Sequence, residues 1–198
     1  MAGEPSTSTA SSIIGLRDVV VAKLLTDVKG TGATYDTPIP FAPAISASIS
    51  ANGAVTSIYT DDGPSESVSA IGEIEVEFES SQIIKTALAL VLGHTINSDG
   101  VLEKSIQDVA PNVAIGFRSL KANGSYHYVW LLKGKFAVPD EKYQTKDNNV
   151  SAQTATIKGS FLRRQADDLY EVAVDSDDTN LGASVIENWL TAVYAPAA

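Results

Sequence analysis

The chain has 198 residues, of which 24 are acidic and 14 basic, so its formal net charge is −10. A chain of this length can bury one sizeable core but is short for two complete domains. Its acidic balance opposes tight binding of nucleic acid, because a negative surface repels phosphates. The sequence has no cysteine, which excludes disulfides, thiolate metal sites and thiol nucleophiles.

The N-terminal residues 1–12 are small and polar, and we expect them to form a flexible arm because they can bury little apolar surface. They lack the basic and apolar regions of a secretory signal. No segment approaches the roughly 20 apolar residues that a membrane-spanning helix needs, so no membrane insertion is expected. Residues 13–195 are predicted to form a single β-rich domain.

The first strands are predicted from β-branched residues and from alternation. Residues Asp18–Leu25 are rich in valine and leucine, and glycines and prolines follow them. Isoleucine and alanine then alternate with serine over Ala44–Ala51, which is typical of a half-buried strand. Asn52-Gly53 predicts a turn before a short strand at Val55–Thr60, and the segment Thr60–Pro64 predicts another turn.

The segment Ile71–Glu79 shows the clearest alternation in the chain. Its two predicted faces are an apolar one, Gly72, Ile74, Val76 and Phe78, and an acidic one, Glu73, Glu75, Glu77 and Glu79. We interpret the acidic row as a solvent face or as the lining of a lumen, along which a polyanion would slide without binding. Directly after it, Ser80-Ser81 can cap a helix that runs through Leu92 and ends at Gly93.

A β-hairpin is predicted around Asn123-Gly124, with strands at Ala114–Ala122 and Ser125–Val138. Asn-Gly suits a two-residue type I′ turn, in which both residues have positive φ. That register places Lys121 opposite Tyr126, Ser119 opposite Tyr128 and Phe117 opposite Trp130.

This register collects the aromatic residues on one face of the hairpin, and we expect that face to lie in a core or an interface. The aromatic face is Phe117, Tyr126, Tyr128 and Trp130, and the opposite face bears Arg118 and His127. Gly134 predicts a bulge or bend in the returning strand, and Pro139 is expected to end it.

The polar stretch 139–150 is predicted to be an exposed loop, and its candidate contact residues are Glu141, Lys142, Tyr143 and Lys146. Strands are predicted at Ser151–Leu162 and Leu169–Val174, and an acidic turn follows at Asp175–Thr179. A C-terminal helix at about 180–194 is predicted from apolar residues at helical spacing, namely Leu181, Val185, Ile186, Trp189, Leu190 and Val193.

The sequence indicates no catalytic, cofactor or metal site. Its two histidines, His94 and His127, lack neighbouring ligands, so we interpret both as structural. The acidic turn lacks the glycine and glutamate of a calcium loop, because Asn180 and Ile186 stand in their places. We interpret that turn as a solvated helix start.

Four segments together carry a resemblance to a known family. The main one is Phe117-Arg-Ser followed by Gly124-Ser-Tyr-His-Tyr-Val-Trp-Leu-Leu-Lys-Gly-Lys-Phe136 and Pro139-Asp-Glu. The others are Gly15-Leu through Thr34-Tyr35, the segment Ile58–Gly63, and the strand–helix pair ending Leu92-Gly93. In their order and spacing over about residues 13–175, the chain resembles the major tail proteins of long-tailed, siphovirus-type bacteriophages. The family usually has Tyr-Ala-Asp-Asn at Tyr59, whereas this chain has Thr60 and Asp62.

The resemblance implies a mainly β fold with two helices (α+β), a β-sandwich or open barrel with a flanking helix, as in a tail tube. It implies a structural protein rather than an enzyme, with no cofactor, which self-assembles into hexameric rings stacked as the tail tube. The implied partners are further copies, the tape measure and the tail terminator, with DNA only in transit. The candidate residues for the contact between rings are Glu141, Lys142, Tyr143 and Lys146. The implied locations are the virion tail and, during assembly, the host cytoplasm.

Two alternatives remain open. The same strands could form a β-sandwich binding module for carbohydrate or a cell surface, which would require Tyr126, Tyr128 and Trp130 to be exposed to solvent. A hydrolase that uses the glutamate row would depend on carboxylates such as Glu75 and Glu77.

Overall fold

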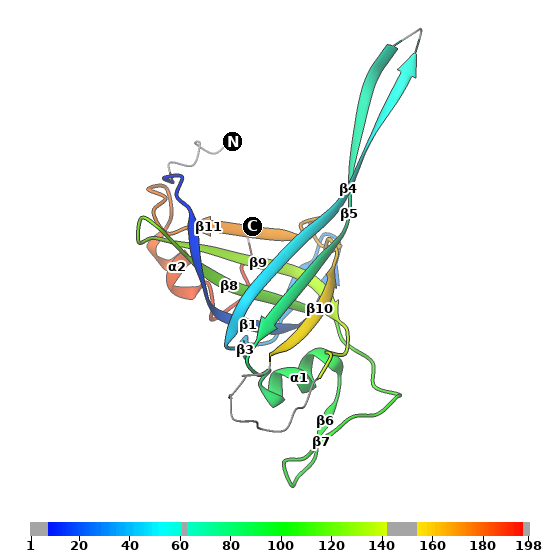
Figure 1. The fold of residues 1–198 in the computed structure, drawn as a ribbon, viewed down its shortest axis with the longest axis vertical. Helices are drawn as coiled ribbons and strands as arrows, with labels where there is room; N and C mark the ends of the chain where they lie inside the picture. The colour runs from blue at the N-terminus through cyan, green and yellow to red at the C-terminus, as the bar shows by residue number, and fades with distance from the viewer. Residues whose placement is uncertain (1–7, 61–62, 142–153, 196–198) are drawn as a thin grey trace, which may run out of the picture.

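The computed structural model describes residues 8–60, 63–141 and 154–195, with the backbone alone over 54–71. These residues form antiparallel strands and two short helices (Figure 1). In chain order the elements are β1 (Ile13–Val28), β2 (Gly32–Tyr35), β3 (Ile39–Ala42), β4 (Ala44–Thr60), β5 (Gly63–Ser80), α1 (Lys85–Leu92), β6 (Thr95–Ile96), β7 (Leu102–Glu103), β8 (Val113–Lys121), β9 (Tyr126–Phe136), β10 (Ala155–Phe161), β11 (Glu171–Asp175) and α2 (Ala183–Asn188).

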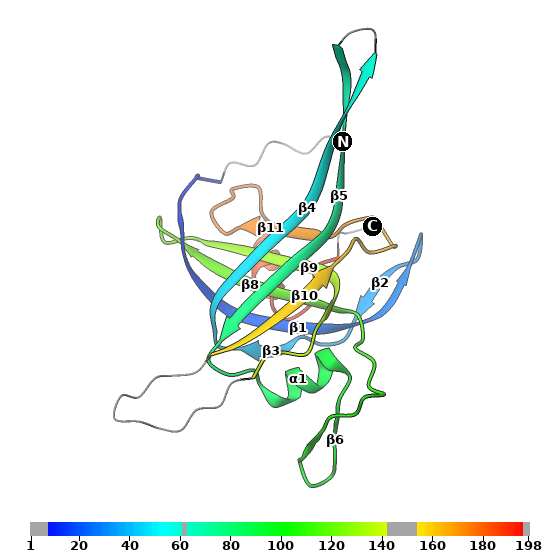
Figure 2. The ribbon, with the colours of Figure 1, turned by 45° about the vertical axis from the view of Figure 1, so that its right-hand side comes forward.

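One sheet carries most of the fold, with the strand order β2-β1-β8-β9-β10-β5-β4. Off this path, β3 pairs with β1 and β11 pairs with β9, while β6 and β7 form a separate small sheet. The large sheet curls strongly, and α1 lies across one end of the curl (Figure 2). The predicted fold class is therefore confirmed: the described chain is mainly β, with two helices.

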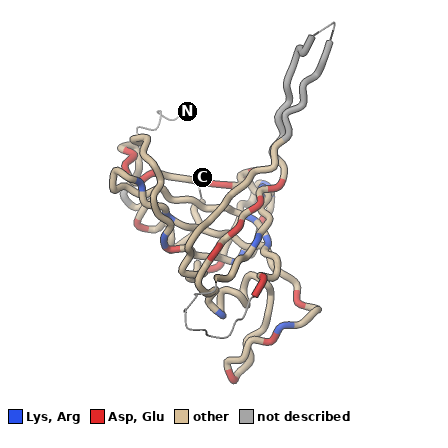
Figure 3. Tube along the Cα trace, in the orientation of Figure 1, with Lys and Arg blue, Asp and Glu red and all other residues tan. Residues whose placement is uncertain are grey.

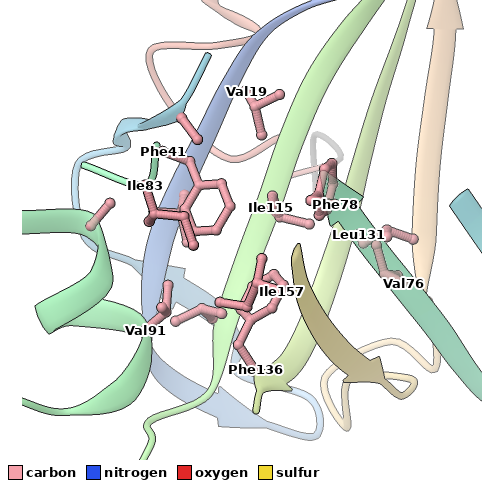
Figure 4. Packing of buried hydrophobic residues seen from close by; sticks show 14 of the residues in the cluster. Val19, Phe41, Val76, Phe78, Ile83, Val91, Ile115, Leu131, Phe136 and Ile157 are labelled. Atoms are coloured by element: carbon pink, nitrogen blue, oxygen red, sulfur yellow. The ribbon is translucent and has the colours of Figure 1, made fainter. Parts of the chain in front are cut away.

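The main core fills the inside of the curled sheet. Phe41, Phe78 and Phe136 meet there, and the rings of Phe41 and Phe136 stack with their centroids 5.5 Å apart (Figure 4). Ile83 and Val91, before and within α1, close the end of this core. A second cluster lies on the other face of β8 and β9, where α2 packs against Ala114, Tyr128, Trp130 and Leu132.

The prediction of a turn at Asn52-Gly53 is wrong, because β4 continues through these residues to Thr60. The register between β4 and β5 shifts between Ala51 and Gly53, so the extra residue is absorbed in a β-bulge. Gly72 of β5 permits the close approach there, since a Cβ on it would lie 2.8 Å from the Asn52 carbonyl oxygen. The next predicted turn centres on residues 61–62, outside the described residues, and Thr60 pairs with Gly63 across it.

Both helices begin later than the sequence predicts. Ser80-Ser81 does not cap α1, because the Ile84 amide donates a hydrogen bond to the Phe41 carbonyl and keeps the chain extended against β3. The predicted end is confirmed, since Gly93 has the left-handed conformation at φ 75°. The C-terminal helix spans only Ala183–Asn188 rather than about 180–194, although its predicted apolar side does pack on the second cluster.

The hairpin exists, but its predicted register is wrong by one residue. The Lys121 amide donates to the Ser125 carbonyl, and the Gly124 amide donates to the Lys121 carbonyl. Gly124 has a φ of 87°, whereas Asn123 is not among the residues with positive φ. The connection is therefore a three-residue loop, and the Asn123 side chain supports it by accepting a hydrogen bond from the Ser125 amide.

A shift of one residue exchanges the faces of one strand relative to the other. In the observed register Leu120 pairs with Tyr126, Arg118 with Tyr128, and Phe117 with Val129. Phe117 thus faces the main core, away from the tyrosines, and Arg118 lies 4.7 Å from the Tyr126 ring centroid. The prediction that Phe117 shares a face with the tyrosines and that Arg118 lies opposite is therefore wrong: Arg118 is on the face of the tyrosines, and Phe117 is on the other.

The remaining strands lie close to their predicted positions. The predicted segment Asp18–Leu25 lies within β1, and β10 and β11 fall on the two strands predicted near the C-terminus. The predicted bulge at Gly134 is confirmed, because the register shifts between the pairs Val113–Gly134 and Ile115–Leu131. A Cβ on Gly134 would lie only 2.4 Å from the Phe161 ring.

This close approach predicts that Gly134→Ala destabilises the protein by about 2–3 kcal/mol, because a buried ring would have to move. Gly15→Ala is the matched control: its Cβ would meet Leu120 at an ordinary 3.7 Å, so we expect a change within about 0.5 kcal/mol. Urea unfolding of the two variants measures the difference. Equal effects would contradict the assignment of Gly134 as a packing constraint.

Candidate functional site

The acidic row lies on the outer face of β5. Glu73, Glu75 and Glu77 are exposed and Glu79 is half-buried, while Ile74, Val76 and Phe78 of the same strand are each 1% exposed. Gly72, predicted for the apolar face, is exposed. Figure 3 shows the acidic row as successive red bands along β5.

Polar side chains flank the row on both neighbouring strands. On β4, Ser46, Ser48 and Ser50 stand opposite Glu79, Glu77 and Glu75, and on β10 the corresponding residues are Thr156, Lys158 and Ser160. The Nζ of Lys158 lies 3.4 Å from Glu77, but both side chains are largely exposed, so solvent screens the pair. A shallow groove of about 540 Å³ runs over this face. The row is thus an open, hydrated surface.

Along this row, β4 and β5 also form the most extended feature of the fold. Their pairing runs from Ala44–Ser80 to Thr60–Gly63, whereas β10 pairs with β5 only between Ile74 and Ser80. Beyond Ile74 the two strands continue as a two-stranded ribbon that projects from the body (Figure 1). In the described sheet β4 is the last strand, so its outer edge is unpaired.

Residues 139–141 of the predicted loop are described, and of its four candidate contact residues only Glu141 is among them. It is exposed, and its carboxylate lies 3.0 Å from the Nζ of Lys104. Lys142, Tyr143 and Lys146 lie outside the described residues.

The two histidines lie on different elements, and each contacts its own carboxylate. The Nδ1 of His94 is 2.5 Å from Asp108, and that of His127 is 2.7 Å from Asp175. Among the described residues, no three His, Cys, Asp or Glu side chains gather as a metal site would require. No described helix has the length and hydropathy to cross a membrane.

The hairpin aromatics do not form an exposed platform. Trp130 is fully buried and Tyr128 is 5% exposed, because α2 covers them. The indole Nε1 of Trp130 donates a 2.7 Å hydrogen bond to the Trp189 carbonyl at the end of α2. A ligand could reach neither ring without displacing this helix.

A buried polar cluster that the sequence did not reveal joins β1, β2 and β9 to the loop after β10. Arg164 is 2% exposed and forms a bidentate pair with Asp167, and it also donates to the Tyr35 hydroxyl. The hydrogen bond to Asp167 raises the pKa of Arg164. The Arg-x-x-Asp spacing was the only local signal for this pair.

Asp27 is the second node of that cluster. Its carboxylate accepts hydrogen bonds from Lys133 Nζ at 2.6 Å and from the amides of Gln165 and Ala166. Burial opposes its ionisation, but these donors outweigh burial and hold the pKa of Asp27 below its usual value. Asp27 thus fixes the loop after β10 to the end of β1.

A second unpredicted cluster surrounds Lys121 at the end of β8. Lys121 is 4% exposed, and its Nζ lies 3.1 Å from Asp177 and 3.4 Å from Asp175. The interpretation of the acidic turn as a solvated helix start is therefore wrong: Asp175 and Asp177 pair with Lys121, and α2 starts only at Ala183.

Comparison with known proteins adds no assignment, since no protein-family model and no curated protein matches the chain. The structure does place the four segments of the resemblance in the fold. They occupy β1 with β2, the outer end of the β4–β5 hairpin, the β5–α1 pair, and the β8–β9 hairpin.

Asp27→Asn is expected to destabilise the protein by about 2 kcal/mol at pH 7, because three donors lose a charged acceptor. Since the pKa of Asp27 is lowered in the folded state, its contribution is present above its usual pKa of roughly 4 and is lost as the pH falls through the folded value. The difference from the wild type should therefore shrink at about pH 3.

Urea unfolding at both pH values measures this, with Asp168→Asn as the control. Asp168 pairs with Arg163, but both side chains are more than half exposed, so its loss should change stability by less than about 0.5 kcal/mol. Equal destabilisation by the two variants, or a difference that persists unchanged at low pH, would show that Asp27 is not a buried acceptor.

Proposed function

We propose that this chain is the subunit of a bacteriophage tail tube, in which copies join into hexameric rings and the rings stack into a conduit for the genome. The order of the four resembling segments supports this proposal, and so do two features of the structure: a projecting hairpin and an acidic face. Its partners are then further copies of the chain, the tape measure and the tail terminator. The chain resides in the virion tail and, during assembly, in the host cytoplasm.

The projecting β4–β5 ribbon is the observation that carries the proposal. A two-stranded ribbon is marginally stable alone, because each strand has one unpaired edge and no third strand supports it. Unpaired edges of this length are templates for pairing with another chain. The ribbon therefore needs a partner, and a neighbouring copy in a ring supplies one.

The free edge of β4 extends this joint along the body of the subunit. On this proposal the edge pairs with a different surface of the next copy, so that the contact is head-to-tail. Such head-to-tail contacts close into a ring when the rotation between copies fits a whole turn. A ring is thus the assembly that this geometry favours.

The acidic row suits a passage for DNA. Two lysines, Lys135 and Lys158, lie beside the row, but the row itself presents glutamates from alternate positions of one strand. A wall of this kind repels phosphates within about 8 Å at physiological ionic strength and leaves the DNA free to move. On this proposal Glu73, Glu75 and Glu77 face the lumen.

The alternatives receive less support. A binding module needs exposed aromatic rings, whereas Tyr128 and Trp130 are buried under α2 and Tyr126 is half-buried. A hydrolase needs an enclosed carboxylate pair, whereas the glutamates lie along an open face beside a shallow groove.

The purified chain is expected to form rings or tubes in negative-stain micrographs at high concentration. The test variant lacks residues 54–70 and joins Gly53 to Ile71, which face each other in the native register, through an Asn-Gly link. It should remain folded by circular dichroism, because the core positions of β5 start at Ile74, but it should stay monomeric. Tubes of normal length from this variant, or a wild type that is monomeric at every concentration, would refute the proposal that the β4–β5 ribbon joins neighbouring copies.

Charge reversal tests the acidic row. Tubes that carry Glu73→Lys, Glu75→Lys and Glu77→Lys together should retain short duplex DNA, with an affinity that falls steeply with salt. If the row lines the lumen, the retained DNA is protected from nuclease. The matched control carries Gln at the three positions and should retain none. DNA that is bound but digested as fast as free DNA would place the row outside the tube.

A further inference from the structure

The start of the described chain lies across the turn of the β8–β9 hairpin (Figure 1). We name residues 8–14 the strap. The Ala122 amide donates to the Ser12 carbonyl at 2.8 Å, and the Asn123 amide donates to Ser11 Oγ at 3.1 Å. The Thr9 amide donates to Asp177 at 3.2 Å, so the strap also reaches the segment after β11.

The surface under the strap is built without it. Lys121 is fixed between Asp175 and Asp177, and the side-chain amide of Asn123 donates to Asp177 at 3.0 Å. His127 holds the other oxygen of Asp175 at 2.7 Å. These groups come from β8, the hairpin turn, β9 and the end of β11, and together they form a rigid polar site for an extended segment rich in serine and threonine.

The strap itself is held loosely. Its two large apolar side chains, Ile13 and Ile14, are 60% and 64% exposed, so it contributes little to the core. A hollow of about 210 Å³ lies between the strap and Lys121. Hydrogen bonds to backbone, hydroxyl and carboxylate groups therefore provide most of its attachment, which is typical of segments that open locally.

The strap is also separated from the rest of β1 by irregular pairing. The register with β8 shifts between Ile13 and Gly15, and again between Arg17 and Val20. Between these last two, Asp18 has a φ of 51°, which is uncommon for a residue with a side chain. These bulges allow the strap to leave its site while the strand from Val20 onward keeps its pairing.

We propose that the site around Lys121 is a docking site for the strap of a second copy, so that assembled copies exchange residues 8–14. Every copy carries the same strap, and the site is complementary to the strap of any copy because it already binds its own. Exchange of an identical segment needs only an open hinge and a neighbour within reach. The inference rests on the proposed function for that neighbour, and it assigns the N-terminal strap as a second joint beside the β4–β5 hairpin.

The absence of cysteine makes the test direct. One variant carries Ser11→Cys and another carries Asn123→Cys, two positions that hydrogen-bond in the structure. The two are mixed at assembling concentration and oxidised, and cross-linked peptides are identified by mass spectrometry. The control mixture pairs Asn123→Cys with Thr31→Cys, which lies in the exposed connection between β1 and β2.

In an equal mixture, exchange predicts that about half of the Ser11→Cys chain becomes covalently joined to Asn123→Cys, because each strap meets the site of either variant at random. The control mixture should give only background. If rings form but no joined chains appear, the strap stays in its own copy: the inference is then wrong while the tube proposal stands. If joined chains appear without rings, exchange holds and the tube proposal fails. If neither appears, both fail.

Discussion

Along β5, apolar and acidic side chains alternate, and this alternation positions both the main core and the acidic face. Burial of Ile74, Val76 and Phe78 in the main core directs every intervening glutamate to the opposite face, because successive side chains of a strand point to opposite sides. The packing of the core and the position of the acidic face are therefore set together by the orientation of this one strand. A shift of this strand by one residue would bury the carboxylates and expose the aliphatic residues, which neither the core nor the proposed passage could tolerate.

The same two-sidedness organises β9, where both faces are buried. Val129 and Leu131 enter the main core, while Trp130 and Leu132 lie under α2. The three-residue turn sets the register of β9 with β8, and so determines which residues of the two strands share a face. The hydrogen bond from Trp130 to the end of α2 holds the helix in place. Tyr128 and Trp130, which suggest a ligand platform in the sequence, instead form the surface on which α2 packs.

Polar clusters hold the ends of the chain to this framework. Arg164 and Asp27 fix the loop after β10 to the β1–β2 end of the sheet, and Lys121 ties the end of β11 to the hairpin turn. These contacts hold the other segments against the body of the subunit, whereas the β4–β5 ribbon projects from it (Figure 1). Both joints proposed for assembly, the ribbon and the strap, are thus segments whose pairing the isolated subunit leaves incomplete or weakly held.

Short-range periodicity and the backbone freedom of glycine were sufficient to predict several features from the amino-acid sequence. These are the β-rich class, the two-faced strand at β5, the helix end at Gly93, the bulge at Gly134 and the apolar side of α2. Other features became visible only in the folded chain: the hairpin register, the continuation of β4 through Asn52-Gly53, the later helix starts and the clusters around Lys121 and Arg164. These depend on groups far apart in the chain: the partner strand beyond a bulge, the carbonyl of Phe41, and carboxylates that reach a buried cation. Local propensity does not encode such partners, so packing and electrostatics between distant segments fixed them.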